Sequence, residues 1–334
     1  MKYLMGMKLP ILSEIESAAK LVYATMPPTP QYSWPLVNLR VGAEVWIKHE
    51  NHSPVGAFKL RGAVVYLSWL VKRIPGIRGV VAATRGNYGQ GVALAARALG
   101  LHTVIVVPHG NSVEKNRAIL SQGAELIEFG IDFQAALEHA RQLAARRGFH
   151  MVESMHERLV HGSATYAREF FQGAPPMDRV YVPIGLGSSI CGMVAARNAL
   201  GLSTEIIGVV SELSPSYALS FEQGVLVEHA STSEIADGLA CRRPVEAALD
   251  VIRANVNRIV RVSDEEIRAA MRALFEDTHN VAEGAGAAAM AAVLKDKDQL
   301  VGKRVGAILS GANIDADLFA KVLMETATDN AIVA

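Results

Sequence analysis

Residues 79 to 108 read GVVAATRGNYGQGVALAARALGLHTVIVVP, and this stretch decides the fold. The apolar run GVVAAT (79–84) predicts a short strand, and YGQGVALAARALG (88–100) predicts a helix that ends at glycine. A second apolar run, TVIVVP (103–108), predicts the next strand. Short apolar strands that alternate with amphipathic helices are typical of a parallel sheet covered on both faces. The sequence therefore predicts an α/β fold.

The same alternation extends in both directions from this stretch. It predicts strands at 44–50, 125–129, 180–185, 205–212 and 303–311, and helices at 112–124, 132–148, 190–201, 264–278, 284–295 and from about Asp315. We interpret the pattern as two α/β domains with open twisted sheets, a small one of residues 79–156 and a large, discontinuous one of residues 1–78 and 157–334. Ligands of such sheets bind where loops leave the carboxyl ends of the strands.

Composition narrows the classes of function. The 334 residues carry a formal net charge of zero, which argues against nucleic acid as a partner. The two cysteines provide no disulfide framework, and no run of 18 apolar residues predicts a membrane span. The first residues also lack the apolar region and cleavage site of a signal peptide. We therefore expect a cytoplasmic protein that does not bind membranes.

Four loops at strand ends combine glycine with polar residues: SPVGAFKLRGA (53–63), TRGNYGQG (84–91), GLGSS (185–189) and SGANID (310–315). GLGSS precedes a predicted helix, so its backbone amides and the helix dipole could bind a phosphate. A tight turn that requires small residues is the alternative. A dinucleotide site is disfavoured because Ile190 stands where the fingerprint G-x-G-x-x-G requires its last glycine.

The other loops also have simple alternatives. TRGNYGQG could bind a carboxylate at a helix start, or Asn87 could be the helix N-cap. In SGANID, either Asn313 or Asp315 could cap the last helix. Lys59 lies in a loop among small uncharged residues, and it could be a solvated surface charge. A partly desolvated lysine amine, however, forms a Schiff base with a carbonyl compound.

These motifs, in this order along residues 27 to 320, resemble the serine/threonine dehydratase group of fold-type II pyridoxal-phosphate enzymes. The motifs EIADGLA (234–240) and AEGAGAAA (282–289) also belong to the resemblance. It implies that the large domain binds pyridoxal 5′-phosphate in a cleft between the two domains. Small amino acids would be the substrates, and a homodimer would be the assembly.

The resemblance implies a role for each loop. Lys59 would hold the cofactor through a Schiff base and act as the base at the substrate Cα, with Phe58 beside the ring. Asn87 would hydrogen-bond the phenolic oxygen of the cofactor, and Ser310 its pyridine nitrogen. The phosphate would be bound by Gly185, Leu186, Gly187, Ser188 and Ser189. The substrate would be bound by Ser53, Thr84, Arg85, Gly86, Asn87 and Tyr88.

The neutral hydroxyl of Ser310 makes the cofactor a weaker electron sink, which favours β-elimination over transamination. The implied activity is an ammonia-lyase that dehydrates an L-β-hydroxy-α-amino acid such as threonine or serine, giving a 2-oxo acid and ammonia. The alternatives are 3-hydroxyaspartate or phenylserine as substrate, β-replacement, and serine racemisation. A ligand sensor without catalysis and a nucleotide-binding protein are further alternatives, which the intact Lys59 and the failed fingerprint disfavour.

Arg85 departs from the pattern of the family. The usual Ser-Ser-Gly-Asn-His is here Thr-Arg-Gly-Asn-Tyr, and the second serine is the acid/base of the family's racemases. Arg85 stays protonated, so racemisation is disfavoured. It could bind a carboxylate of the substrate, or it could hold the loop through an ion pair with a nearby Asp or Glu.

Two further expectations concern metal binding and regulation. The family's cation site retains Glu212, but Ser216 and Ala218 stand where further ligands are expected. Because a hard cation needs several oxygen ligands, we predict no metal site. The chain stops near residue 334, so we expect no C-terminal regulatory domain of the kind found in biosynthetic threonine deaminases.

Overall fold

The larger sheet forms the centre of the molecule. The computed structural model describes residues 7–233 and 235–325. Within them, six strands form a sheet in the order β1-β2-β10-β7-β8-β9, parallel except for β1, which pairs antiparallel with β2. The strands are β1 (Gln31–Ser33), β2 (Glu44–His49), β7 (Arg179–Pro183), β8 (Glu205–Ser211), β9 (Arg258–Val262) and β10 (Arg304–Leu309).

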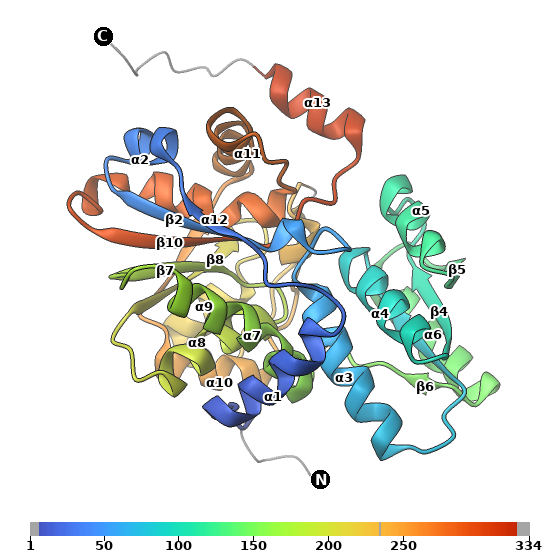
Figure 1. The fold of residues 1–334 in the computed structure, drawn as a ribbon. Helices are drawn as coiled ribbons and strands as arrows, with labels where there is room; N and C mark the ends of the chain where they lie inside the picture. The colour runs from blue at the N-terminus through green and yellow to red at the C-terminus, as the bar shows by residue number, and fades with distance from the viewer. Residues whose placement is uncertain (1–6, 234, 326–334) are drawn as a thin grey trace.

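The smaller sheet lies beside the larger one, at the right of Figure 1. It is parallel throughout, in the order β5-β4-β3-β6. Its strands are β3 (Gly79–Ala83), β4 (His102–Val107), β5 (Glu125–Glu128) and β6 (His150–Met151). All of them come from one continuous part of the chain. The exact domain limits given above stay a prediction.

Helices cover both sheets. In Figure 1, α2, α11 and α12 lie on one face of the larger sheet, and α7, α8 and α10 lie on the other. The helices are α1 (Leu12–Tyr23), α2 (Pro35–Val41), α3 (Lys59–Arg73), α4 (Asn87–Ala98), α5 (Val113–Ser121), α6 (Phe133–Arg147), α7 (Glu157–Gly173), α8 (Ser188–Ala199), α9 (Ser216–Gln223), α10 (Glu246–Asn255), α11 (Asp264–Thr278), α12 (Gly284–Lys295) and α13 (Ala316–Met324). Coverage on both faces explains why inner parallel strands such as β3 and β10 are largely apolar.

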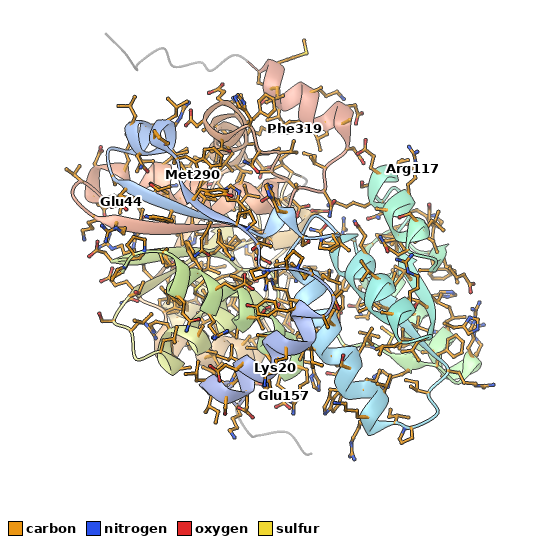
Figure 2. The ribbon with its side chains drawn as sticks, in the orientation of Figure 1. Lys20, Glu44, Arg117, Glu157, Met290 and Phe319 are labelled. Carbon is orange, nitrogen blue, oxygen red and sulfur yellow. The ribbon has the colours of Figure 1, made fainter. Side chains whose placement is uncertain are left out.

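Apolar side chains lie between the layers and most charged side chains lie at the surface, as the layered fold requires. Met290 of α12 is only 2% exposed and lies in the interior, whereas Lys20 and Arg117 extend from the surface (Figure 2). Phe319 of α13 packs edge to face on Phe275 of α11, with ring centroids 5.7 Å apart. In residues 7–233 and 235–325, no helix has the length and apolar composition that a membrane span requires.

The predicted α/β fold is confirmed, and several predicted elements match the observed bounds closely. One expectation about the lysine motif is wrong. Lys59 is not in a loop but is the first residue of α3, and Phe58 precedes it as the N-cap residue. The loop with its small residues ends at Phe58, and α3 then continues through the buried residues Leu60 to Leu67. The helix therefore fixes the position of Lys59.

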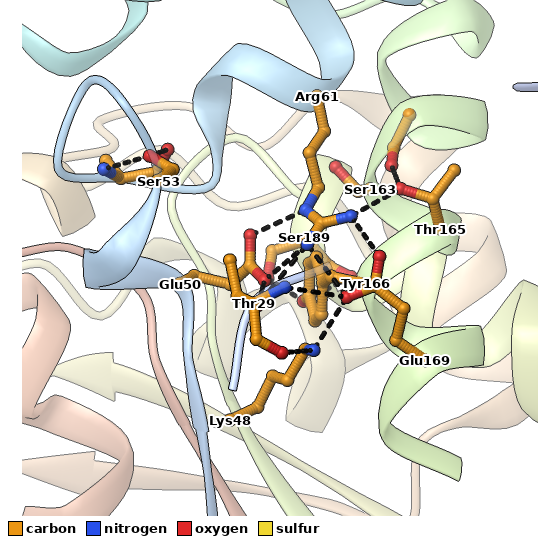
Figure 3. A network of polar contacts seen from close by, with 12 residues as sticks. Thr29, Lys48, Glu50, Ser53, Arg61, Ser163, Thr165, Tyr166, Glu169 and Ser189 are labelled. Atoms are coloured by element: carbon orange, nitrogen blue, oxygen red, sulfur yellow. Dashed lines mark hydrogen bonds and ion pairs between the residues drawn. The ribbon is translucent and has the colours of Figure 1, made fainter. Parts of the chain in front are cut away.

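A buried network of ion pairs anchors the first turn of α3 (Figure 3). The Arg61 guanidinium lies 2.7 Å from Glu50, which follows β2, and 2.6 Å from Glu169 of α7. Lys48 of β2 binds the second oxygen of Glu169 at 2.7 Å. The Thr165 hydroxyl accepts a further hydrogen bond from Arg61 at 3.0 Å. The network therefore connects α3 with β2 and α7, two residues beyond Lys59.

We expect Arg61→Met to lower the free energy of unfolding by about 3–5 kcal/mol, because Glu50 would remain buried without its cation and Glu169 would keep only Lys48. Chemical denaturation measures the loss. Arg73→Met is the matched control, since Arg73 is an exposed residue at the end of the same helix. An equal effect of the two substitutions would show that the network does not anchor α3.

Candidate active site

A cavity of about 150 Å³ opens where loops from both sheets meet. It lies beyond the carboxyl ends of β3 and β7, at the starts of α3, α4 and α8. The lining residues are Lys59, Ala83, Thr84, Arg85, Gly86, Asn87, Tyr88, Lys115, Phe133, Ser154, Gly185, Leu186, Asp237, Gly238 and Ala240. This is the place where parallel α/β sheets bind ligands. The cavity thus brings together residues of three of the four loops that the sequence singled out.

Backbone contacts tie the lysine motif to the loop after β10. The Phe58 amide donates to the Ser310 carbonyl at 3.1 Å, and the Ala312 amide donates to the Gly56 carbonyl at 2.9 Å. Gly56 has a φ of 66°, and a Cβ there would lie 2.7 Å from Oδ1 of Asn313. A side chain at Gly56 would therefore be strained and would displace Asn313. The fourth loop reaches the site through these contacts.

Lys59 is a cation without a compensating partner. Its side chain is half-buried and faces the cavity, with Nζ 4.7 Å from the centre of the Phe58 ring. No hydrogen bond or ion pair joins its amine to another residue in the described part of the chain. Burial lowers the pKa of Lys59 from an ordinary value of 10.5 to about 8, although the negative charge of Glu283 opposes this shift. A neutral, nucleophilic amine is thus accessible near physiological pH.

The loop after β3 adopts a shape that only glycine allows. Gly86 has a φ of 146°, and a Cβ there would lie 2.4 Å from Cδ of Lys115. Its amide donates to the Thr84 hydroxyl at 3.0 Å. The next amides belong to the first turn of α4, where they have no partner within the helix. The start of α4 can therefore bind an anion such as a carboxylate.

Asn87 does not cap α4, so that alternative is wrong. Gly86 is the N-cap residue, and Asn87 is the first residue of the helix. Its side-chain amide donates to Glu283 at 2.5 Å and accepts from Asn313 at 2.8 Å. Asn313 also donates to the Val55 carbonyl at 2.8 Å. The Asn87 side chain is thus fixed, at the wall of the cavity, by the N-cap residue of α12 and by the loop after β10.

Three charged residues near the cavity were missed by the sequence analysis. Lys115 of α5 lies 2.8 Å from Asp237 and 3.2 Å from Glu283. The two carboxylates raise the pKa of Lys115 well above its ordinary value despite burial. Burial raises the pKa of the Glu283 carboxyl, and Lys115 opposes that shift. The motifs EIADGLA and AEGAGAAA contain the two acids, but nothing in the sequence pairs them with Lys115.

The glycines of GLGSS permit a close approach of backbone at the start of α8. A Cβ on Gly185 would lie 2.5 Å from the Gly238 carbonyl oxygen, and Gly187 has a φ of 105°. Helix α8 begins at Ser188, so both serines belong to its first turn. The Ser189 hydroxyl is hydrogen-bonded to Tyr166 at 2.7 Å. The Leu186 carbonyl accepts from Tyr217 at 2.9 Å. The amides of this turn remain suited to a phosphate.

The remaining predicted residues lie around this centre. The Ser53 hydroxyl accepts a hydrogen bond from the Ala57 amide at 2.9 Å and donates one to the Ala57 carbonyl at 2.7 Å. Ser53 is absent from the cavity lining. Ser310 is buried, and its hydroxyl donates to the Ala285 carbonyl at 3.4 Å. Tyr88 donates from its hydroxyl to the Glu153 carbonyl at 2.8 Å. Ser53 thus shapes the loop that carries Lys59.

Arg85 is exposed and lines the cavity. Its guanidinium has no ion pair or hydrogen bond with any residue in ranges 7–233 and 235–325. The expectation that Arg85 holds its loop through a nearby carboxylate is therefore wrong. Asp315 is the N-cap residue of α13, which is one of the two alternatives expected for SGANID. Its side chain makes no capping hydrogen bond, and its carboxylate accepts from the Ser112 hydroxyl at 2.6 Å.

The described residues contain no group of three or more His, Cys, Asp or Glu side chains arranged to bind a metal. Glu212 is exposed, and the Ser216 hydroxyl donates to the Cys241 carbonyl at 2.6 Å. Ala218 is buried and offers no side-chain ligand.

Comparisons with known proteins identify the class. A family model described as pyridoxal-phosphate dependent enzyme matches residues 23–311. L-threo-3-hydroxyaspartate ammonia-lyase of Saccharomyces cerevisiae is 32% identical over 318 residues, covering 95% of this chain and 97% of that protein. L-threonine ammonia-lyase of Thermotoga maritima is 34% identical over 286 residues, covering 84% and 70%. The solved structure of maize serine racemase superimposes with a TM-score of 0.87 at 26% identity, covering 94% and 97%.

The fold and these matches define the class as fold-type II pyridoxal-phosphate enzymes. The chain belongs to the pyridoxal-phosphate-dependent enzymes, in their serine/threonine dehydratase group, and the resemblance seen in the sequence is confirmed. The residues present fit the cofactor, because Lys59 has an amine without a partner and the start of α8 has free amides beside a glycine turn.

The lowered pKa of Lys59 predicts how the cofactor-free protein takes up pyridoxal phosphate. Only the neutral amine attacks a carbonyl, so the rate constant should rise about tenfold per pH unit at low pH. It should then level off near pH 8 instead of near 10.5. Stopped-flow absorbance between pH 6 and 11 measures the midpoint, with N-acetyl-lysine as the control for ionisation of the cofactor itself.

Glu283→Gln provides the second arm of this experiment. Because the charge of Glu283 raises the pKa of Lys59, its removal should move the midpoint to lower pH. A wild-type rate constant that keeps rising to pH 10 would contradict the lowered pKa.

Proposed function

We propose that this protein is an ammonia-lyase that dehydrates an L-β-hydroxy-α-amino acid of the threonine or serine kind. The observation that carries the proposal is the unpaired Lys59 amine, with its pKa of about 8, in a cavity between two anion-binding helix starts. The ammonia-lyases among its relatives support the same reaction. Bound pyridoxal phosphate would supply an electron sink for the electron pair released at the substrate Cα.

Each of the two helix starts would bind a different anion. The first turn of α8, with Gly185, Gly187 and Ser188, would bind the cofactor phosphate. The first turn of α4, with Gly86 and Asn87, would bind the substrate α-carboxylate. Lys59, which would hold the cofactor, would have its amine available to the Cα proton once the substrate is bound. This placement supports Lys59 as the base, because a neutral amine near pH 8 can accept a proton.

The elimination needs no oxidant or reductant. The Cα–H and Cβ–O bonds break, and the β-hydroxyl leaves as water with one proton. The resulting enamine takes up water, and a 2-oxo acid and ammonia are released. Ser310 would contact the ring nitrogen of the cofactor with a neutral hydroxyl, which favours this prompt elimination. Arg85, which stays protonated, would not serve as the second base of a racemase.

The proposal is tested with L-threonine and L-serine as substrates. Purified protein should be yellow and should release equal amounts of 2-oxo acid and ammonia. Lys59→Ala should lower the rate at least about a thousandfold, because both the covalent link and the base are lost. Exposed Lys72 on the same helix is the matched position, and Lys72→Ala should keep the activity. Pyruvate from serine without free ammonia, or retained activity in Lys59→Ala, would contradict the proposal.

The assembly rests on the resemblance, and the location rests on the expectation from the sequence pattern. We propose a homodimer in the cytoplasm, with the active site in the cleft between a small domain of residues 79–156 and the rest of the chain. The cavity lining supports the cleft, because it combines residues of the loops after β3 and β7. Analytical ultracentrifugation of the holoenzyme would measure the assembly.

A further inference from the structure

One of the cations that line the cavity has no charged partner and no other role in the site. Among the lining residues of the described chain, those with charged side chains are Lys59, Arg85, Lys115 and Asp237. Lys115 is compensated, since it lies 2.8 Å from Asp237 and 3.2 Å from Glu283. Lys59 is the residue that holds the cofactor. The guanidinium of Arg85 has no partner in the described ranges, so it is available to an anion that enters the cavity.

Arg85 stands beside the proposed carboxylate site. It directly precedes Gly86, the N-cap of α4, and both residues line the cavity. The first turn of α4 supplies amide donors for one carboxylate. The guanidinium supplies a separate planar fork for another. Two anion-binding groups on adjacent residues match a substrate with two carboxylates separated by a short carbon chain.

We propose that Arg85 binds the distal carboxylate of the substrate, so that the preferred class is β-hydroxy-α-amino dicarboxylates such as 3-hydroxyaspartate. This inference rests on the proposed ammonia-lyase activity. With such a substrate the Cα–H and Cβ–O bonds break, water leaves, and hydrolysis of the enamine gives a four-carbon 2-oxo diacid and ammonia. No oxidant or reductant is needed.

The exposure of Arg85 determines what kind of selectivity to expect. An exposed guanidinium stays hydrated when a monocarboxylate such as threonine occupies the cavity, so threonine is not rejected by an unpaired buried charge. The dicarboxylate gains a charge-assisted hydrogen bond that threonine lacks. Arg85 therefore confers preference for the diacid, and threonine remains a poorer substrate.

Steady-state kinetics tests the preference. The ratio of kcat/KM for L-threo-3-hydroxyaspartate to that for L-threonine should fall by about ten- to a hundredfold in Arg85→Ser. Arg85→Lys should give an intermediate ratio, because the charge remains but the fork is lost. Arg141→Ser, at an exposed position on α6 outside the cavity lining, should change the ratio by less than about twofold.

A binding measurement separates recognition from turnover. L-aspartate and L-asparagine are nearly the same shape but differ in the distal charge, and neither carries a β-hydroxyl that can leave as water. Titration followed by the absorbance of the bound cofactor gives their dissociation constants. The wild-type protein should bind aspartate more tightly than asparagine, and Arg85→Ser should reduce that difference by about ten- to a hundredfold.

The outcomes distinguish the two proposals. Turnover of threonine and the diacid with a ratio that Arg85→Ser leaves unchanged would overturn the role of Arg85 and keep the ammonia-lyase. Equal binding of aspartate and asparagine by the wild-type protein would also overturn it. Release of ammonia from none of the hydroxy amino acids would contradict the proposed function, whereas the aspartate measurement would still report on Arg85. Thermal melting shows whether each variant is folded.

Discussion

The contact between Arg61 and its two carboxylates positions the whole site. Arg61 is completely buried, and its ion pairs with Glu50 and Glu169 hold the start of α3 against β2 and α7. Two residues earlier, Lys59 has no such compensation, and burial lowers its pKa. The same helix turn thus carries one cation that is fully paired and one that is left free. The first provides the rigidity that keeps the second in an unfavourable setting.

Close helix packing complements this network. A Cβ on Gly162 of α7 would lie 2.4 Å from the Arg61 carbonyl oxygen, and a Cβ on Gly192 of α8 would lie 2.7 Å from the Ala164 amide nitrogen. Glycine therefore lets α7 contact α3 on one side and α8 on the other. The helices that carry Lys59 and the GLGSS turn are consequently held by one shared neighbour. Backbone atoms take part in both of these helix contacts.

The fold could be read from the sequence because its signals are local. Apolar runs such as 79–84 and 103–108 became parallel strands, since the hydrophobic pattern alone specifies burial on both faces. The site was only partly predictable, because its remaining interactions join distant residues. Asn87 has the chemistry of an N-cap, yet its partners are Glu283 and Asn313. Lys115 lies in an ordinary amphipathic helix, and only the meeting of the two sheets brings it to Asp237.

The charge of Arg85 is independent of the groups that control the protonation of Lys59. The pKa of Lys59 responds to burial and to Glu283, and Arg85 is not among the groups that shift it. Arg85 also makes no contact that the network of Asn87, Lys115 and Glu283 needs. A substitution at position 85 can therefore alter the charge offered to a ligand while the amine of Lys59 keeps its protonation behaviour. Under the proposed function, specificity would reside on a loop residue, and the chemistry would reside on a helix start anchored by the core.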